Sequence, residues 1–148
     1  MGAPRISYQS GYKYQLVEDY SLFVGITPPA KGVCIDTKFI ELTEDGLLII
    51  RAGYAWDGPS GPAFDTPTFM RASLVHDALY QLMREKHLDA AVHRVKADEI
   101  LRDLCKEDGM WAARVWWVYK AVRRAAGPAA DARGIKPILY APHQWKPN

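Results

Sequence analysis

Residues from about 12 to 56 have the composition of β-strands, and in 12–25 aromatic and β-branched residues stand at roughly alternate positions with no apolar stripe at helical spacing. Such alternation is typical of strands that bury one face. Loops divide the region into three segments, 12–25, 33–42 and 47–56. The loop from Thr43 to Gly46 has the composition of a tight turn. The pattern therefore predicts an antiparallel sheet of at least three strands, the last two forming a hairpin.

After residue 67 the apolar residues recur at steps of three and four, which is the spacing of an amphipathic helix. Three helices are predicted, over about 68–84, 90–107 and 110–126. The residues expected to face inward are Ala72, Val75, Leu79, Leu82 and Met83 in the first helix, Val92, Val95, Ile100, Leu101 and Leu104 in the second, and Trp111, Val115, Val118 and Val122 in the third.

Glycine and proline mark the boundaries of these elements. Residues 57–67 hold two glycines and three prolines, so they are predicted to form a shaped loop between the sheet and the first helix. Thr66 or Thr68 is expected to cap that helix. Gly127-Pro128 is expected to stop the third helix.

The last segment, 128–148, holds four prolines and shows no period. Its apolar residues suggest a tail that packs back on the body: Ile135, Ile138, Leu139, Tyr140 and Trp145. The length of 148 residues and a composition of 49% hydrophobic and 24% charged residues fit one ordinary globular domain. We therefore expect a single α+β domain, with an antiparallel sheet over about 12–56 and three helices packed on one side of it.

Composition excludes several classes of function. A net charge of +2, from 19 basic and 17 acidic residues, is too small to favour nucleic-acid binding by the whole molecule. No zinc, nucleotide or haem motif is present, and Cys34 and Cys105 are expected to be reduced, buried thiols. The sequence shows neither a signal peptide nor a run of about 18 apolar residues. We therefore expect no transmembrane segment, and we expect the protein to be located in the cytoplasm.

Polar residues interrupt the apolar face of the first predicted helix. His76 and Tyr80 lie one turn apart, and Asp77 begins a second edge. A buried imidazole, carboxylate or phenol needs a hydrogen-bonding partner. Asp98, near the buried face of the second helix, is expected to fix the tautomer of His76, which could then take a proton from water. Arg94, four residues before Asp98, is the competing partner for that carboxylate.

The loop that follows the sheet offers a binding site. Its expected binding residues are Asp57, Gly58, Ser60 and Gly61, because the glycines let the backbone approach a ligand closely. Asp77 is expected to point away from the histidine and towards Asp57 in this loop. These two carboxylates, together with loop carbonyls and water, could hold calcium. The same loop could instead hold an anion through its amides, or form a plain corner closed by an Asx-turn.

A structural interpretation stands beside the catalytic one. His76, Tyr80 and Asp98 could form a satisfied polar bridge that ties two helices together. In that case the helix carrying Trp116 and Trp117, together with the tail, would contact a partner protein, because tryptophan is enriched at interfaces.

Several motifs together resemble a known family. They are Tyr54-Ala-Trp-Asp-Gly-Pro-Ser-Gly-Pro62, the stretch from Ala72 to Tyr80, the pair Ala97-Asp98, and a last helix ending at Gly127. Together they resemble the phage- and prophage-associated domain of unknown function 1353, over roughly residues 37–127. The resemblance implies a small phage-encoded protein in the host cytoplasm or in the phage particle.

A second resemblance, at the level of motifs, is to the bacterial secreted phospholipases A2. His76, Asp77 and Tyr80 match their histidine-aspartate pair and tyrosine, the glycine loop around 58–61 stands where they have a calcium loop, and Asp98 matches their second aspartate. The resemblance implies that His76 activates water, that Asp98 orients it, and that Asp77 with loop carbonyls holds calcium.

This chain also departs from those enzymes. Their flanking cysteines are replaced by Val75 and Leu79, and its β-rich first third has no counterpart in them. The leading hypothesis is a phage hydrolase, calcium-assisted, that cleaves an ester or amide bond in a lipid or cell-envelope component. The alternative is a non-enzymatic phage protein, either a virion or tail component or a binder of a host factor.

Overall fold

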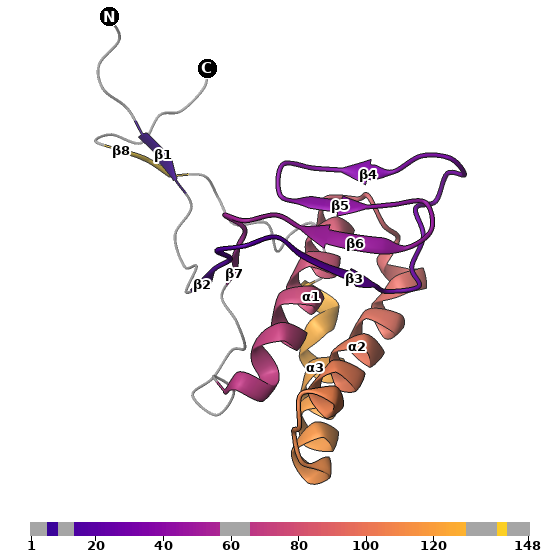
Figure 1. Cartoon of the computed structure of the whole chain (residues 1–148), viewed down its shortest axis with the longest axis vertical. Coiled ribbons are helices and arrows are strands. Elements are labelled where there is room, and N and C mark those ends of the chain that lie inside the picture. The colour runs from indigo at the N-terminus through magenta and orange to yellow at the C-terminus, as the bar shows by residue number, and fades with distance from the viewer. Residues whose placement is uncertain (1–5, 9–13, 57–65, 130–138, 142–148) are drawn as a thin grey trace, which may run out of the picture.

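The computed structural model describes residues 6–8, 14–56, 66–129 and 139–141. Strands come first and three helices follow, which confirms the predicted α+β class (Figure 1). The strands are β1 (Ile6–Tyr8), β2 (Tyr14–Gln15), β3 (Tyr20–Phe23), β4 (Ile35–Asp36), β5 (Ile40–Leu42), β6 (Leu47–Ile50), β7 (Ala55–Trp56) and β8 (Leu139–Ala141). The helices are α1 (Pro67–Arg84), α2 (Ala90–Glu107) and α3 (Ala112–Ala129).

The main sheet has four antiparallel strands in the order β3-β6-β5-β4. The predicted hairpin is confirmed as β5–β6, and its turn is closed by the Gly46 N–H, which donates to the Thr43 carbonyl at 3.0 Å. Its strands are shorter than predicted, because residues 33–42 divide into β4 and β5, and residues 47–56 into β6 and β7. Gly46 has a φ of +90°, and a Cβ there would lie 3.2 Å from the Ile26 carbonyl oxygen, so the turn requires glycine.

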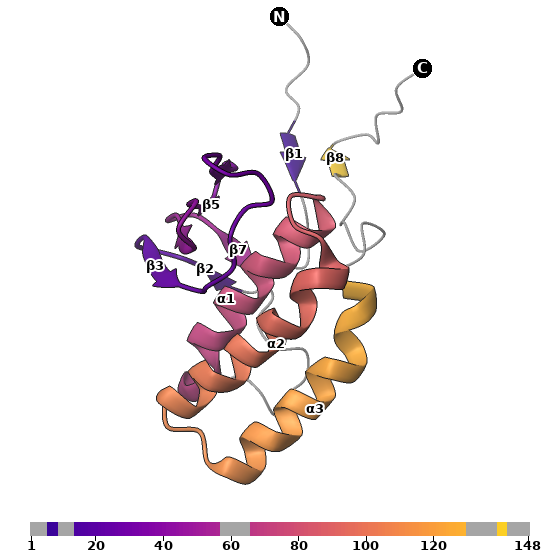
Figure 2. The ribbon, with the colours of Figure 1, turned by 90° about the vertical axis from the view of Figure 1, so that its right-hand side faces the viewer.

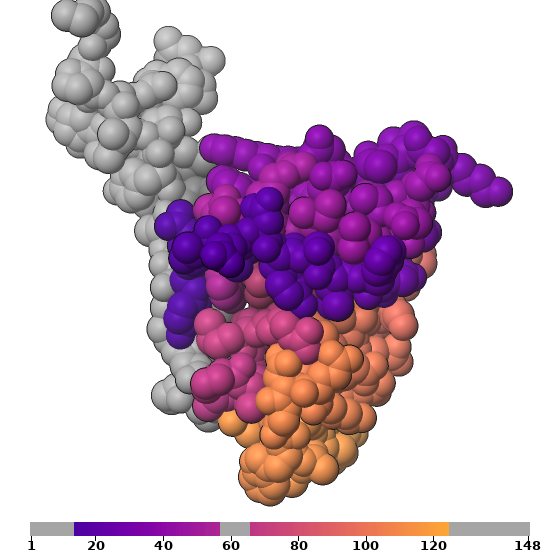
Figure 3. All heavy atoms as spheres, viewed as in Figure 1, coloured from indigo at the N-terminus to yellow at the C-terminus, as the bar shows by residue number. Residues whose placement is uncertain are grey.

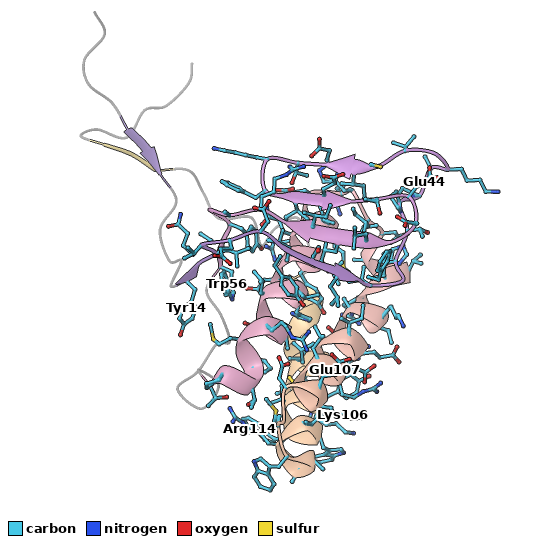
Figure 4. The ribbon with its side chains drawn as sticks, viewed as in Figure 1. Tyr14, Glu44, Trp56, Lys106, Glu107 and Arg114 are labelled. Carbon is cyan, nitrogen blue, oxygen red and sulfur yellow. The ribbon has the colours of Figure 1, made fainter. Side chains whose placement is uncertain are left out.

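The predicted first strand, 12–25, is interrupted. Its first part, β2, pairs with β7 in a separate two-stranded ladder, and its second part, β3, joins the main sheet. The chain bends between them, and there the Asp19 carboxylate accepts a hydrogen bond from the Ala52 backbone N–H at 2.8 Å. The side chains of Tyr14 and Trp56 meet across the short ladder, with ring centroids 5.7 Å apart (Figure 4).

The helices form two layers beneath the sheet. α1 lies next to the sheet, α2 packs beside α1, and α3 packs against α2 on the outer side (Figures 1 and 2). The inner face of the sheet is fully apolar, with Ile40, Leu42, Leu48 and Ile50 at most 1% exposed. In Figure 3 the residues of the sheet cover the upper part of the helices.

α1 is the central element, and every residue predicted for its inward stripe is buried. A hydrogen bond of 3.2 Å from the Trp56 indole N–H to the Ser73 hydroxyl connects α1 to β7. α1 begins at Pro67, one residue before the predicted start, and Thr66 occupies the N-cap position. The Thr66 side chain makes no capping bond, because its hydroxyl lies 3.2 Å from that of Thr68 instead.

Two helix predictions are wrong in burial. Val92 is 64% and Val95 45% exposed, because the buried stripe of α2 is centred near Leu101, and these valines lie roughly 180° and 120° round the helix from it. Trp111 is 70% exposed, because it precedes the first turn of α3 and does not share that helix's inward face.

Both ends of α3 differ from their predictions. α2 has the predicted bounds, but α3 begins at Ala112 and continues through Gly127-Pro128 to Ala129. A proline removes an N–H and crowds the carbonyl four residues earlier, but only one helical residue follows Pro128, so few helical bonds are affected.

Both cysteines are free, as predicted, although Cys34 is exposed and only Cys105 is buried. Burial raises the pKa of the Cys105 thiol to about 12, which leaves that thiol protonated and unreactive.

The described part of the tail, β8, pairs with β1 at the other end of the chain, and not with the main sheet. Ile135, Ile138 and Trp145, which were expected to pack on the body, lie outside the described residues. In the described part of the chain, none of the helices combines the length and apolarity needed to span a bilayer.

Candidate functional site

A buried polar cluster lies where the three helices meet. It consists of His76 and Tyr80 from α1, Asp98 from α2 and Arg123 from α3, and is called the Asp98 cluster below. Asp98 is 0% exposed and His76 only 9%, in surroundings that are otherwise almost wholly apolar. A charged residue is rarely buried so completely unless it is paired.

Asp98 accepts a hydrogen bond from each of its three neighbours. Its Oδ1 lies 2.7 Å from His76 Nε2 and 2.6 Å from the Tyr80 hydroxyl. Its Oδ2 lies 2.5 Å from Arg123 Nη1. The carboxylate therefore has both a balancing positive charge and neutral donors, which is the condition under which a buried charge is tolerated.

The helical spacing explains this convergence. His76 and Tyr80 lie one turn apart on α1, so both side chains reach the same carboxylate, and their ring centroids are 4.0 Å apart. Asp98 lies between the buried residues Ala97 and Leu101 of α2, which direct it towards α1. The cluster is thus a consequence of how α1 and α2 pack.

The pKa shifts of Asp98 and Tyr80 indicate the protonation state of each group. Burial alone would raise the pKa of Asp98, but the hydrogen bonds from His76, Tyr80 and Arg123 outweigh it, and the pKa is lowered. Burial, then the hydrogen bond to Asp98, raises the pKa of Tyr80. Asp98 is therefore an ionised acceptor at neutral pH, and Tyr80 is a protonated donor.

His76 lies between two carboxylates, so the prediction that Asp77 points away from it is wrong. Its Nδ1 is 4.0 Å from Asp77 Oδ1, which is an ion-pair distance too long for a hydrogen bond. Burial lowers the pKa of His76, but Asp77 and then Asp98 raise it by more, so the net shift is upward. Because Asp98 only accepts, Nε2 carries a hydrogen, and in the neutral ring the lone pair is on Nδ1.

Sequence reasoning did not find Arg123. Arg94 was considered as the rival partner of Asp98, but no hydrogen bond or ion pair joins these two described residues. The only sequence signal for Arg123 is its place next to Val122, beside the inward stripe of α3. Several other arginines on the helices have similar neighbours, so the choice required the packing of α3 on α2.

The predicted binding loop cannot be compared with this geometry, because the structure does not describe it. Asp57, Gly58, Ser60 and Gly61 lie outside the described residues. Asp77 is described, with a side chain that is 33% exposed. Within the described ranges, no three histidine, cysteine, aspartate or glutamate side chains gather in a way that could hold a metal ion. The calcium site therefore stays a prediction.

The arrangement has a definite chemical capacity. An imidazole whose Nε2 is held by a buried carboxylate presents its other nitrogen in a fixed orientation, ready to accept a proton. Tyr80 and Arg123 hold the carboxylate in place in turn, so the four residues act as one positioned unit.

Comparison with known proteins gives a family but no activity. No curated protein and no solved structure matches the chain. The family described as "Protein of unknown function (DUF1353)" matches residues 35–122, which is more than half of the chain. That span contains His76, Tyr80 and Asp98 and stops one residue before Arg123. The chain belongs to this family, the proteins of unknown function designated DUF1353.

Proposed function

We propose that the protein is a hydrolase in which His76 is the general base, and that it cleaves an ester or amide bond in a lipid or cell-envelope component. One observation carries the proposal. Asp98 holds His76 by Nε2, while Nδ1 makes no hydrogen bond to any residue in the described part of the chain and faces the partly exposed Asp77.

The reaction follows from the tautomer. Nδ1 takes a proton from a water molecule as the water oxygen attacks the carbonyl carbon, and the ring becomes an imidazolium whose charge Asp98 stabilises. The same Nδ1–H then donates its proton to the leaving oxygen or nitrogen as the bond to the carbonyl carbon breaks. His76 is thereby returned to its neutral form.

Tyr80 and Arg123 are positioning residues in this scheme. They contact Asp98, and only His76 exchanges protons with the water and the leaving group. Loss of the Tyr80 hydroxyl would leave Oδ1 with one donor fewer and would loosen the imidazole that shares that oxygen.

The proposal includes a calcium ion, for which Asp77 would be one ligand. A partly exposed carboxylate is a suitable ligand for a hard cation, but it supplies at most two of the roughly six to eight oxygens that calcium takes. Bound there, calcium would polarise the carbonyl of the substrate. Activity is then expected to fall on chelation and to return when calcium is added.

The resemblance to phage- and prophage-associated proteins supports the choice of substrate. A phage must cross the envelope of its host to enter and to leave, so lipids and other envelope components are the first substrates to test.

The decisive experiment compares His76→Gln with His87→Gln. The purified variants are assayed for release of fatty acid from phospholipid vesicles and of soluble products from bacterial envelopes, with calcium and with chelator. His87 is a fair control, because its side chain is 42% exposed and lies 3.8 Å from Glu85, outside the Asp98 cluster. Activity is expected to fall by about a hundredfold or more in His76→Gln alone.

Two outcomes would end the proposal. One is a folded His76→Gln variant with the activity of the unmodified protein. The other is an unmodified protein that hydrolyses none of these substrates with or without calcium, which would leave the Asp98 cluster as a structural bridge.

A further inference from the structure

The exposed side of α3 has an unusual composition. Five exposed residues share an arc of roughly 100° round the helix, if each residue advances by about 100°. They are Ala113, Trp116, Trp117, Lys120 and Arg124, and are called the α3 outer face. Trp116 is 63% and Trp117 50% exposed, and these two residues form the edges of the arc.

Among the described residues, the side of α3 that packs on α2 lies opposite the α3 outer face. Val115 and Val118, which lie outside this arc, are buried. Because α3 packs on α2 and not on the sheet, it lies at the outer side of the helical layers (Figure 2). Trp111, 70% exposed, directly precedes the helix and extends the aromatic surface towards its start.

The charges of this segment all have one sign. Residues 109–130 contain no aspartate or glutamate, although acidic residues are nearly as numerous as basic ones in the whole chain. Their basic residues are Arg114, Lys120, Arg123 and Arg124. Arg123 is bound to Asp98, whereas Lys120 stands over the Trp116 ring with its Nζ 5.5 Å from the centroid. The charged residues of α3 are therefore all basic, although the net charge of the whole chain is only +2.

We propose that the α3 outer face binds the surface of an anionic lipid membrane. Tryptophan prefers the headgroup level of a bilayer, because its ring is apolar and its N–H needs a polar partner. Lysine and arginine beside it attract anionic headgroups, and residues 109–130 contain no aspartate or glutamate. Tryptophan and arginine are also enriched in protein interfaces, whereas lysine and alanine are depleted there. The occupant is therefore chosen on charge, because the basic side chains beside the tryptophans complement an anionic lipid surface.

This proposal deepens the hydrolase proposal, and only its link to a lipid substrate rests on that function. A protein held on a membrane by α3 would meet lipid esters at high local concentration. Membrane binding itself needs no catalysis, so His76→Gln is expected to bind vesicles as the unmodified protein does. Failure of one proposal is therefore distinguishable from failure of the other.

The test uses the full chain with vesicles of phosphatidylcholine, with and without phosphatidylglycerol. Binding is measured by co-sedimentation and by the shift of tryptophan emission to shorter wavelength. The unmodified protein is expected to bind the anionic vesicles, and added salt is expected to weaken the binding. Both the double variant Trp116→Ala/Trp117→Ala and the double variant Lys120→Glu/Arg124→Glu are expected to bind about tenfold more weakly, or worse.

The sheet layer provides matched controls. Lys38 stands over the Phe39 ring at 5.1 Å, in the same kind of pair as Lys120 with Trp116, so Lys38→Glu tests whether any such lysine matters. Phe23 is 67% exposed, so Phe23→Ala tests loss of an exposed aromatic ring elsewhere. Neither control variant is expected to change binding by more than about twofold.

Three results would overturn the proposal. They are absence of binding to anionic vesicles, equal losses in the sheet controls and in the α3 variants, and concentration-dependent self-association that the tryptophan substitutions abolish. The last result would assign the α3 outer face to a second copy of the chain.

Discussion

At the scale of single residues, Asp98 connects all three helices. One oxygen accepts from two groups on α1, and the other accepts from Arg123 on α3. Each of these donors would lose its partner at once if the carboxylate were removed. A partly buried guanidinium left without its carboxylate is costly, because the remaining charge is no longer compensated.

Asp98→Asn should therefore lower the free energy of unfolding by about 3 kcal/mol, because it removes the charge and nearly preserves the volume. The matched control is Asp103→Asn on the same helix, where the side chain is 57% exposed and pairs with Arg102 at 3.0 Å. Its cost should stay below about 1 kcal/mol. Urea unfolding at neutral pH measures both, and similar costs would contradict the role given to Asp98.

The raised pKa of His76 predicts how stability depends on pH. A group whose folded pKa exceeds its unfolded value of 6.5 stabilises the fold fully below that value and loses the contribution as the pH rises through the folded pKa. The difference in unfolding free energy between the unmodified protein and His76→Gln should thus shrink with rising pH. The folded pKa is measured directly by NMR titration of the imidazole, and a value below 6.5 would refute the prediction.

The same shift predicts the effect of Asp77 on catalysis. As a general base, His76 works only when neutral, so activity should rise with pH through its folded pKa. Asp77→Asn removes a nearby negative charge that raises this pKa, and in the proposed reaction it also removes a calcium ligand. The pKa of His76 is therefore compared in the two proteins by NMR titration with chelator present, and it should be lower in the variant. Equal pKa values would contradict the effect given to Asp77.

Most of the Asp98 cluster could be predicted at this scale. The one-turn spacing of His76 and Tyr80, and the apolar neighbours of Asp98, are local properties of helices and are visible in the sequence. Arg123 could not be predicted, because it approaches Asp98 only through the angle at which α3 crosses α2. A contact between two helices depends on side-chain packing along the whole interface.

At the scale of elements, the N-termini of α1 and α2 differ in how they are capped. The Asp89 carboxylate accepts a hydrogen bond of 2.9 Å from the Ala91 N–H at the start of α2. Thr66 holds the same position before α1 with a side chain that makes no such bond. α1 is instead held in place by burial of its sides, whereas the first turns of α2 include the exposed Val92.

Asp89→Ala should therefore cost about 1 kcal/mol of unfolding free energy, and Thr66→Ala about 0.5 kcal/mol or less. Thermal unfolding followed by far-ultraviolet circular dichroism gives both values. A larger loss in Thr66→Ala would show that its hydroxyl pairing with Thr68 matters more than the missing capping bond.

The elements themselves were largely predictable because each depends on local spacing. The hairpin and the bounds of α2 follow from turn residues and apolar periodicity in the sequence. The division of residues 12–25 between β2 and β3 was not predictable, because it depends on β7 and β6, which lie far along the chain. The exposure of Val92 and Val95 depends in the same way on which side of α2 meets α1.

At the scale of the whole molecule, α1 lies between the sheet layer and the helix layer that contains α2, and it packs against both. Arg71 on α1 joins these layers at the surface, since it contacts the Tyr20 hydroxyl of β3 at 3.3 Å and Asp108, directly after α2, at 2.7 Å. The apolar residues of sheet and helices accordingly form one core.

Leu79→Ala in α1 should lower the unfolding free energy by about 2–5 kcal/mol, because Leu79 is 0% exposed and its removal leaves a cavity. Tertiary and secondary structure should still be lost in one coincident transition, observed by near- and far-ultraviolet circular dichroism. Phe23→Ala, at an exposed site of the sheet, should change stability by less than about 0.5 kcal/mol. Two separate transitions would contradict the single core.

The pairing of β1 with β8 has a consequence for the connectivity of the chain. Ile6 is opposite Ala141 in an antiparallel ladder, so two segments from opposite parts of the sequence lie side by side (Figure 1). A short peptide that joins Ile6 to Ala141 would therefore close the backbone across this ladder, and the chain could be reopened in the exposed loop at Lys31 and Gly32. The order of the segments along the backbone is thus separable from the three-dimensional arrangement that holds Asp98, and a circularly permuted gene should encode the same architecture.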